Sequence, residues 1–87
     1  MAPRIVLYTT RTCAYCVRAR VLLDAKRAAY EEIDVSGDHA QRAWLVEATG
    51  RRTVPQIFFG DESIGGFDEL RAMDVAGELD RRLASDA

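Results

Sequence analysis

Both cysteines of this 87-residue chain lie at one junction, where a strand pattern gives way to a helix pattern. The apolar run 5–8 is rich in β-branched and aromatic side chains, which predicts a buried strand. Between residues 14 and 26, apolar side chains recur every three or four positions, which predicts a helix with one buried face. Cys13 and Cys16 therefore lie at the start of that helix, close enough to form a disulfide with each other.

The rest of the chain continues as an alternation of strands and helices. Strands are predicted at 30–35, 56–59 and 63–64, and helices at 39–49 and from 67 to the end, the last with an interruption near 74–77. One strand-helix-strand unit followed by a hairpin predicts an α/β protein with a four-stranded mixed β-sheet and helices on both faces. This arrangement is the thioredoxin fold.

The spacing of apolar residues also predicts which helix faces are buried. In the helix 39–49, the core side is expected to comprise Ala40, Ala43, Leu45 and Ala48. Trp44 falls beside that face, so its partial exposure is expected. The apolar positions of the last helix are Leu70, Met73, Val75, Leu79 and Leu83.

Composition and charge limit the class of protein. Hydrophobic residues make up 48% and charged residues 30%, a globular balance, and the length predicts a single domain, 1–87. A formal charge of -2, with basic and acidic residues interspersed, predicts no nucleic-acid partner. No apolar stretch approaches the roughly 18–20 residues of a membrane span, and the N-terminus does not resemble a secretory signal. A cytoplasmic protein without a membrane partner is therefore expected.

In a reducing cytoplasm, a single cysteine pair favours catalysis, redox sensing or metal binding over a structural disulfide. A closed zinc site takes four ligands, whereas this chain offers two cysteines and only His39. Redox chemistry is therefore favoured. The N-terminus of a helix stabilises a thiolate, so Cys13 is expected to be exposed and attacking, and Cys16, one turn further, shielded and resolving.

Two further stretches allow a plain interpretation and a functional one. In the plain interpretation, Thr53-Val54-Pro55 only marks the start of a strand. In the functional interpretation, the Val54 backbone is an unpaired edge with which an extended peptide can form hydrogen bonds. The stretch 65–70 is either a glycine-rich turn or a ligand site. In the functional interpretation, the N-terminus of the next helix holds a carboxylate and Asp68 holds an ammonium group.

These motifs together resemble those of the glutaredoxin family, and specifically its small bacterial dithiol members. The resemblance rests on Cys-Ala-Tyr-Cys after a Tyr-Thr strand end, Thr-Val-Pro-Gln-Ile-Phe, and Ile-Gly-Gly-Phe-Asp-Glu-Leu, and it covers essentially the whole chain. It implies a glutathione-dependent thiol-disulfide oxidoreductase that reduces protein disulfides and glutathione mixed disulfides through Cys13 and Cys16. It further implies glutathione as co-substrate and a cis bond before Pro55.

The resemblance also implies a set of glutathione-binding residues. The cysteinyl backbone of glutathione is expected to pair with Val54, beside Thr53 and Pro55, and Tyr15 is expected alongside the ligand. The γ-glutamyl group is expected at the helix start formed by Gly66, Phe67 and Asp68. Family members usually bind the glycine carboxylate with a lysine, but Thr10 occupies that position here. Arg11 and Arg42 are the cations expected to replace it.

Two alternatives stay open. Ala14 stands where the commonest motif of the family has proline, and relatives without that proline sometimes hold a [2Fe-2S] cluster between two chains. In that case Cys13 and two glutathiones would be the ligands; otherwise no tightly bound cofactor and a monomer are expected. The second alternative is a redoxin that thioredoxin reductase, rather than glutathione, reduces.

Overall fold

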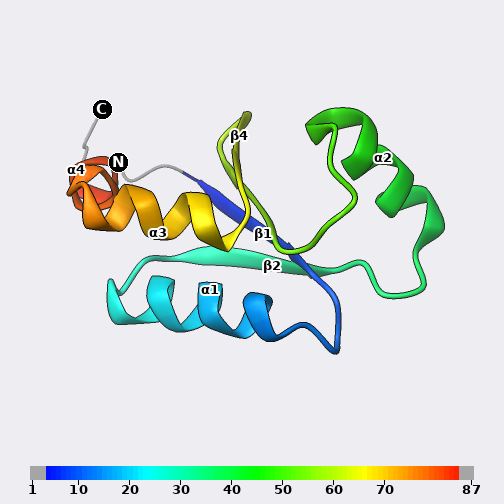
Figure 1. Cartoon of the computed structure of the whole chain (residues 1–87), viewed down its shortest axis with the longest axis horizontal. Coiled ribbons are helices and arrows are strands. Elements are labelled where there is room, and N and C mark those ends of the chain that lie inside the picture. Colours follow the sequence, from blue (N-terminus) through cyan, green and yellow to red (C-terminus); the bar gives the residue numbers. More distant parts are fainter. Residues whose placement is uncertain (1–3, 85–87) are drawn as a thin grey trace.

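The structure, a computed structural model, describes residues 4–84, which form a four-stranded sheet and four helices (Figure 1). In chain order the elements are β1 (Ile5–Thr9), α1 (Ala14–Ala25), β2 (Tyr30–Asp34), α2 (His39–Thr49), β3 (Gln56–Phe59), β4 (Glu62–Gly65), α3 (Phe67–Val75) and α4 (Glu78–Ala84). Every predicted strand and helix is present within these residues; the end of the last predicted helix, residues 85–87, lies outside the described part of the chain. The predicted interruption near 74–77 separates α3 from α4.

The sheet has the strand order β2-β1-β3-β4. β1 runs parallel to β2, with Tyr8 opposite Ile33, and antiparallel to β3, with Tyr8 opposite Gln56. β3 and β4 form an antiparallel hairpin. The mixed sheet and the thioredoxin fold predicted from the order of elements are therefore confirmed.

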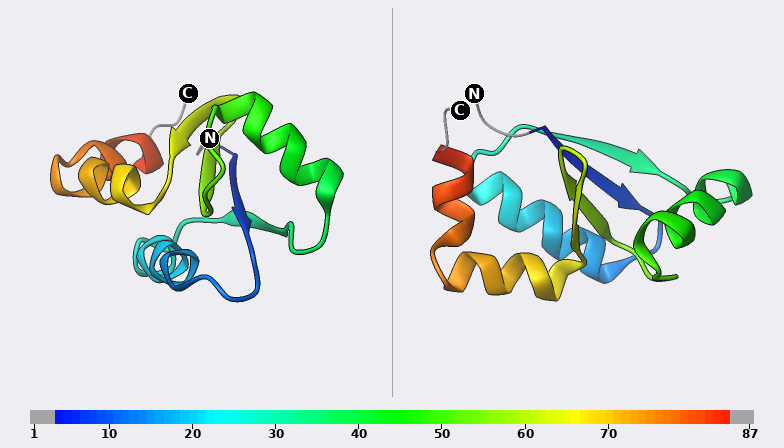
Figure 2. Two further views of the ribbon diagram at one scale, coloured as in Figure 1. Left: turned by 45° about the vertical axis from the view of Figure 1, so that its right-hand side comes forward. Right: turned by 90° about the horizontal axis from the view of Figure 1, so that it is seen from above.

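Alternating residues of the central strand β1 divide the core in two, because successive side chains of a strand point to opposite faces. Ile5 and Leu7 pack on one face with buried residues that include Ala19, Leu23, Leu70 and Leu79 of the helices α1, α3 and α4. Val6 and Tyr8 pack on the other face with Phe58 and with Leu45 of α2. Figure 2 shows α1 and α3 on one face of the sheet and α2 on the other, so helices on both faces are confirmed.

The predicted core side of α2 is wrong at three positions. Ala40, Ala43 and Ala48 are exposed, and Leu45 is the buried residue of this helix. Alanine favours a helix on either face, so its spacing does not identify the face that packs. The ring of Trp44, 47% exposed, stacks on Phe58 with centroids 5.9 Å apart, and this large side chain occupies the contact between α2 and the sheet.

Val75 is also exposed rather than buried. It is the last residue of α3, where the chain turns through Gly77 before α4 begins, so the helical spacing no longer applies. Leu79 of α4 is fully buried as predicted. None of the helices within residues 4–84 has both the length and the hydropathy that crossing a membrane requires.

Candidate active site

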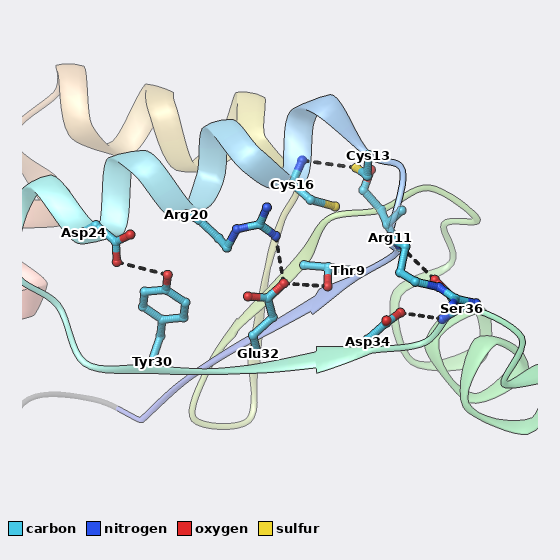
Figure 3. A network of polar contacts seen from close by, with 11 residues as sticks. Thr9, Arg11, Cys13, Cys16, Arg20, Asp24, Tyr30, Glu32, Asp34 and Ser36 are labelled. Atoms are coloured by element: carbon cyan, nitrogen blue, oxygen red, sulfur yellow. Dashed lines mark hydrogen bonds and ion pairs between the residues drawn. The ribbon is translucent and has the colours of Figure 1, made fainter.

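Cys13 is the N-cap residue of α1. Its backbone is extended (φ -130°, ψ 107°), and its Sγ accepts a hydrogen bond from the backbone N–H of Cys16 at 3.1 Å (Figure 3). The sulfur thus takes the capping role that an oxygen of serine or aspartate takes in other helices. This N–H is one of the donors that a helix N-terminus leaves without a backbone partner, and the Cys13 sulfur satisfies it.

Cys16 lies one turn into α1 and is fully buried, whereas Cys13 is half-buried; both are free thiols. Burial raises the pKa of the Cys16 thiol to about 12, and the hydrogen bond with Cys13 acts in the same direction. Cys16 therefore stays protonated at neutral pH, and Cys13 is the accessible sulfur. The predicted order of exposure is confirmed, although Cys13 is less exposed than predicted because its Sγ contacts the Val54 carbonyl at 3.6 Å.

A groove of about 250 Å³ adjoins the thiol pair. It is lined by Tyr15, Arg51, Thr53, Val54, Pro55, Gly66, Phe67, Asp68 and Glu69. Val54 belongs to this lining, and its carbonyl contacts Cys13 Sγ at 3.6 Å, so Val54 connects the groove to the thiol. The structure brings together all residues predicted to bind glutathione except Arg11 and Arg42.

An aromatic pair forms one wall of the groove. The ring centroids of Tyr15 and Phe67 are 6.2 Å apart, and Arg18 Cζ lies 5.1 Å from the centroid of the Tyr15 ring. Tyr15 is 53% exposed, so its ring is available to a ligand. On the opposite side, the Val54–Pro55 peptide bond is cis, as the resemblance implied.

Glu69 and Arg51 also line the groove, near the start of α3, and neither was predicted from the sequence as a site residue. Glu69 Oε1 accepts hydrogen bonds from the backbone N–H of Gly66 at 2.6 Å and from Arg51 Nη1 at 3.0 Å. These two bonds lower the pKa of the Glu69 carboxyl group. The spacing of Gly66 and Glu69 is that of a helix N-cap and the glutamate that closes it, a signal visible in the sequence. Arg51 has no such signal, because its partner is 18 residues away.

Gln56 supports the Thr53 end of the groove from below. Its side chain is fully buried at the start of β3, and Nε2 donates a hydrogen bond to the Thr53 carbonyl at 2.9 Å. This bond ties the loop before Pro55 to the sheet. The position of the Thr53-Val54 backbone is therefore set by a buried side chain rather than by the loop alone.

Arg11 and Arg42 lie outside the lining of the groove. The backbone N–H of Arg11 donates to Ser36 Oγ at 2.9 Å (Figure 3), and Arg42 Nη2 donates to the Arg52 carbonyl at 3.3 Å. His39, the third candidate zinc ligand, begins α2 on the opposite face of the sheet from α1. Within residues 4–84, no three or more His, Cys, Asp and Glu side chains gather into a group that could hold a metal ion.

Comparisons with known proteins agree on one family. The family model described as glutaredoxin matches residues 5–64. Glutaredoxin 3 of Escherichia coli (strain K12) is 43% identical over 76 residues, which cover 87% of this chain and 92% of that protein. A glutaredoxin of Pseudomonas aeruginosa is 43% identical over 83 residues, covering 95% of this chain and 99% of that protein.

Solved structures give the same result. The solution structure of a glutaredoxin from Brucella melitensis matches with a TM-score of 0.84 and 43% identity, covering 94% of this chain and 89% of that chain. The crystal structure of a buckwheat glutaredoxin-glutathione complex matches with a TM-score of 0.87 and 35% identity, covering 93% of this chain and 76% of that chain.

The fold and the paired thiols define a thioredoxin-fold protein with a dithiol centre at the start of its first helix. The family model and the relatives show that this chain belongs to the glutaredoxin family. The resemblance found from the motifs is confirmed, and with it the class of enzyme, a glutathione-disulfide oxidoreductase.

Proposed function

We propose that this chain reduces glutathione mixed disulfides and protein disulfides, with Cys13 as the nucleophile and Cys16 as the resolving thiol. The observation that carries the proposal is the link between thiol and groove: Cys13 Sγ lies 3.6 Å from the carbonyl of Val54, which lines the groove. A peptide ligand seated in the groove would therefore bring its own sulfur to Cys13. The buckwheat relative solved with glutathione supports this choice of ligand.

In the proposed complex, glutathione lies extended along the groove. Its cysteinyl backbone pairs with Val54, whose N–H and C=O make no backbone-backbone hydrogen bond in the loops and turns of residues 4–84. Its γ-glutamyl carboxylate lies at the N-terminus of α3, at the backbone N–H groups of Phe67 and Asp68 beside Gly66, where the helix dipole favours an anion. Asp68 receives the γ-glutamyl ammonium group, and Tyr15 packs along the peptide.

The glycine carboxylate is the end of glutathione with fewest groove contacts in this proposal. Arg11 and Arg42 are the cations proposed for it. Among residues 4–84, the guanidinium of Arg42 donates one hydrogen bond, to the backbone carbonyl of Arg52 at 3.3 Å, so it can move at little cost. Arg51 already lines the groove, but its Nη1 is engaged by Glu69 at 3.0 Å.

The first reaction needs one thiol. The Cys13 thiolate attacks the glutathionyl sulfur of a mixed disulfide, so a Cys13-glutathione disulfide forms and the substrate leaves as a thiolate. A second glutathione then attacks this disulfide, which releases oxidised glutathione and restores Cys13. Cys16 takes no part.

The second reaction needs both thiols. Cys13 attacks a protein disulfide to form a mixed disulfide, and Cys16 then attacks Cys13 Sγ, which closes the Cys13–Cys16 bridge and releases the reduced protein. Glutathione reopens the bridge. A reduction potential of about -200 to -230 mV, typical of the class, makes this last step feasible against a cytosolic glutathione pool.

A hydroxyethyl-disulfide assay tests the proposal. It is run with glutathione plus glutathione reductase and, separately, with thioredoxin reductase, each with NADPH. Turnover in the glutathione system alone supports the proposal. Turnover with thioredoxin reductase alone contradicts it and favours the other class of redoxin. No turnover in either system would also contradict it, and the cluster-carrier alternative would then be tested by anaerobic reconstitution with iron, sulfide and glutathione.

The proposal includes the setting in which the enzyme works. We propose a cytoplasmic monomer in which residues 1–87 form one domain, with glutathione and with disulfide-containing or glutathionylated proteins as its partners. The charge pattern supports a protein that does not bind nucleic acid, because its net charge is -2. Sedimentation of the reduced chain tests the monomer.

A further inference from the structure

The proposed function leaves one requirement unmet, which is how the buried Cys16 thiol becomes a nucleophile. The sulfur has no contact with water, and burial raises the pKa of its thiol to about 12. Resolution of a mixed disulfide nevertheless places negative charge on this atom. A polar network outside the lining of the groove lies on the same side of the sheet as α1 (Figure 3).

The network joins three elements through one carboxylate oxygen. Glu32 Oε2, on β2, accepts a hydrogen bond from Thr9 Oγ1 of β1 at 2.9 Å and from Arg20 Nη1 of α1 at 2.8 Å. Thr9 is buried, and the side chains of Arg20 and Glu32 are 32% and 34% exposed. Solvent and salt therefore screen this ion pair less than a pair on the open surface. The guanidinium of Arg20 is held by groups that the sheet itself positions.

Arg20 follows Cys16 by four residues on α1, so the two side chains are neighbours on the same strip of the helix. In Figure 3 the Arg20 guanidinium lies between the helix that carries Cys16 and the Glu32 carboxylate that it pairs with. Burial raises the pKa of Cys16; a hydrogen bond from the backbone of Thr10 lowers it, and the positive charge of Arg20 acts in that same direction to a smaller extent. The other titratable group at the sulfur is Cys13, which acts in the opposite direction.

We propose that Arg20 is a positioning residue for the resolving step: held by Glu32 and Thr9, its guanidinium stabilises the negative charge that develops on Cys16 Sγ. This inference rests on the dithiol reaction proposed above and adds a residue to it. Arg20 lies outside the groove and does not touch the disulfide being reduced, so it acts through Cys16 alone.

The resolving step balances as a thiol-disulfide exchange. Cys16 loses its proton to solvent, its sulfur attacks Cys13 Sγ, the Cys13–Cys16 bond forms and the bond between Cys13 and the substrate sulfur breaks. The substrate leaves as a thiolate and takes up a proton. One disulfide is consumed and one is formed, so no further oxidant or reductant is needed. Charge on the attacking sulfur is what Arg20 stabilises.

A quenched-flow experiment with oxidised glutathione separates the two steps. Reduced protein is mixed with oxidised glutathione, quenched in acid and analysed by mass spectrometry for the Cys13-glutathione disulfide. The formation of this disulfide reports the attack by Cys13, and its decay reports the attack by Cys16. In Arg20→Met the decay should be slower by about threefold at neutral pH, because a higher pKa of Cys16 lowers the thiolate fraction more than it raises the nucleophilicity of the thiolate. Formation should proceed at the wild-type rate.

Three variants make the result specific. Arg20→Lys keeps a cation and should restore the decay to within about twofold of wild type. Arg71→Met removes an exposed arginine of α3 and serves as the matched control, with no change in either step expected. Arg20→Gln keeps a hydrogen-bond donor for Glu32 but no charge, so it should decay as slowly as Arg20→Met, and it repeats the test if the methionine variant does not fold.

Three outcomes would overturn the inference. The first is decay at the wild-type rate in Arg20→Met and Arg20→Gln. The second is equal slowing of formation and decay, which indicates a purely structural role. The third is failure of Arg20→Lys to restore the decay rate. Turnover of the wild type in the glutathione system is measured first. A wild type without turnover counts against the proposed function, whereas an active wild type with unaffected Arg20 variants counts against this inference alone.

Discussion

Arg51 and Glu69 join the two sides of the groove through an ion pair of 3.0 Å between Arg51 Nη1 and Glu69 Oε1. Arg51 comes from the loop before β3, and Glu69 from the first turn of α3. The same Oε1 atom accepts the N–H of Gly66, so one carboxylate oxygen both caps α3 and fixes the distance across the groove.

Replacing this carboxylate should weaken both the cap of α3 and the ion pair across the groove. Glu69→Gln removes the charge that the helix N-terminus and Arg51 stabilise, and we expect a loss of about 0.5–1 kcal/mol in the free energy of unfolding, since the side chain is partly exposed. Urea denaturation measures the loss. Glu47→Gln, an exposed glutamate of α2, is the control and should change stability by less than about 0.5 kcal/mol. Equal stability of the two variants would contradict a stabilising role for the charge of Glu69.

Gly65 should tolerate a side chain less well than Gly60. Both have positive φ (114° and 62°), but a Cβ on Gly65 would lie 2.7 Å from Glu69 Oε1, whereas a Cβ on Gly60 has no atom within 4 Å. Gly60→Ala should therefore cost about 1 kcal/mol from the backbone alone, and Gly65→Ala about 2–3 kcal/mol. Thermal unfolding of the two variants compares them. A smaller loss in Gly65→Ala would show that Glu69 moves away freely.

Mutation should separate the roles of the two cysteines. Cys13→Ser should abolish reduction of both glutathione mixed disulfides and protein disulfides, because it removes the nucleophile of both reactions. Cys16→Ser should keep the first activity and lose the second. The hydroxyethyl-disulfide assay and reduction of a protein disulfide measure the two. Retained activity in Cys13→Ser would reverse the assignment of roles.

The resolving step should accelerate with pH. Because burial raises the pKa of Cys16 to about 12, the reactive thiolate is a small fraction near neutrality. That fraction grows about tenfold per pH unit while the pH stays below the pKa. The logarithm of the decay rate of the Cys13-glutathione disulfide should therefore rise with pH, with a slope near one between about pH 6.5 and 8.5. A flat profile would mean that proton loss from Cys16 does not limit the step.

The contact between α2 and the sheet should depend on one residue. Leu45→Ala removes the buried side chain of α2 and should lower the free energy of unfolding by about 2–4 kcal/mol, through lost burial and the cavity it leaves. Ala43→Lys, at an exposed position on the same helix, should change it by less than about 0.5 kcal/mol. A large loss in the free energy of unfolding of Ala43→Lys would instead support the alanine face that spacing predicted as the packed side of α2.

Much of the fold was predictable because its signals are local. The continuous apolar run of β1, the helical spacing that buries Ala19 and Leu23, and the glycine at the end of α2 each depend on a few neighbouring residues. The alanines of α2 were not predictable in this way, since alanine suits either face of a helix. A large aromatic residue, Trp44, took the contact instead.

The sequence by itself determined the cysteine pair at the start of a helix, the order of the elements and the motifs of the groove, because the cysteine pair and the segments around Pro55 and Gly66 are contiguous stretches of chain. Only the tertiary structure decided that Arg51 pairs with Glu69 and that Arg20 pairs with Glu32. These charges lie 18 and 12 residues apart along the chain. Their pairing depends on how the sheet and helices pack, and no local pattern of residue types records that packing.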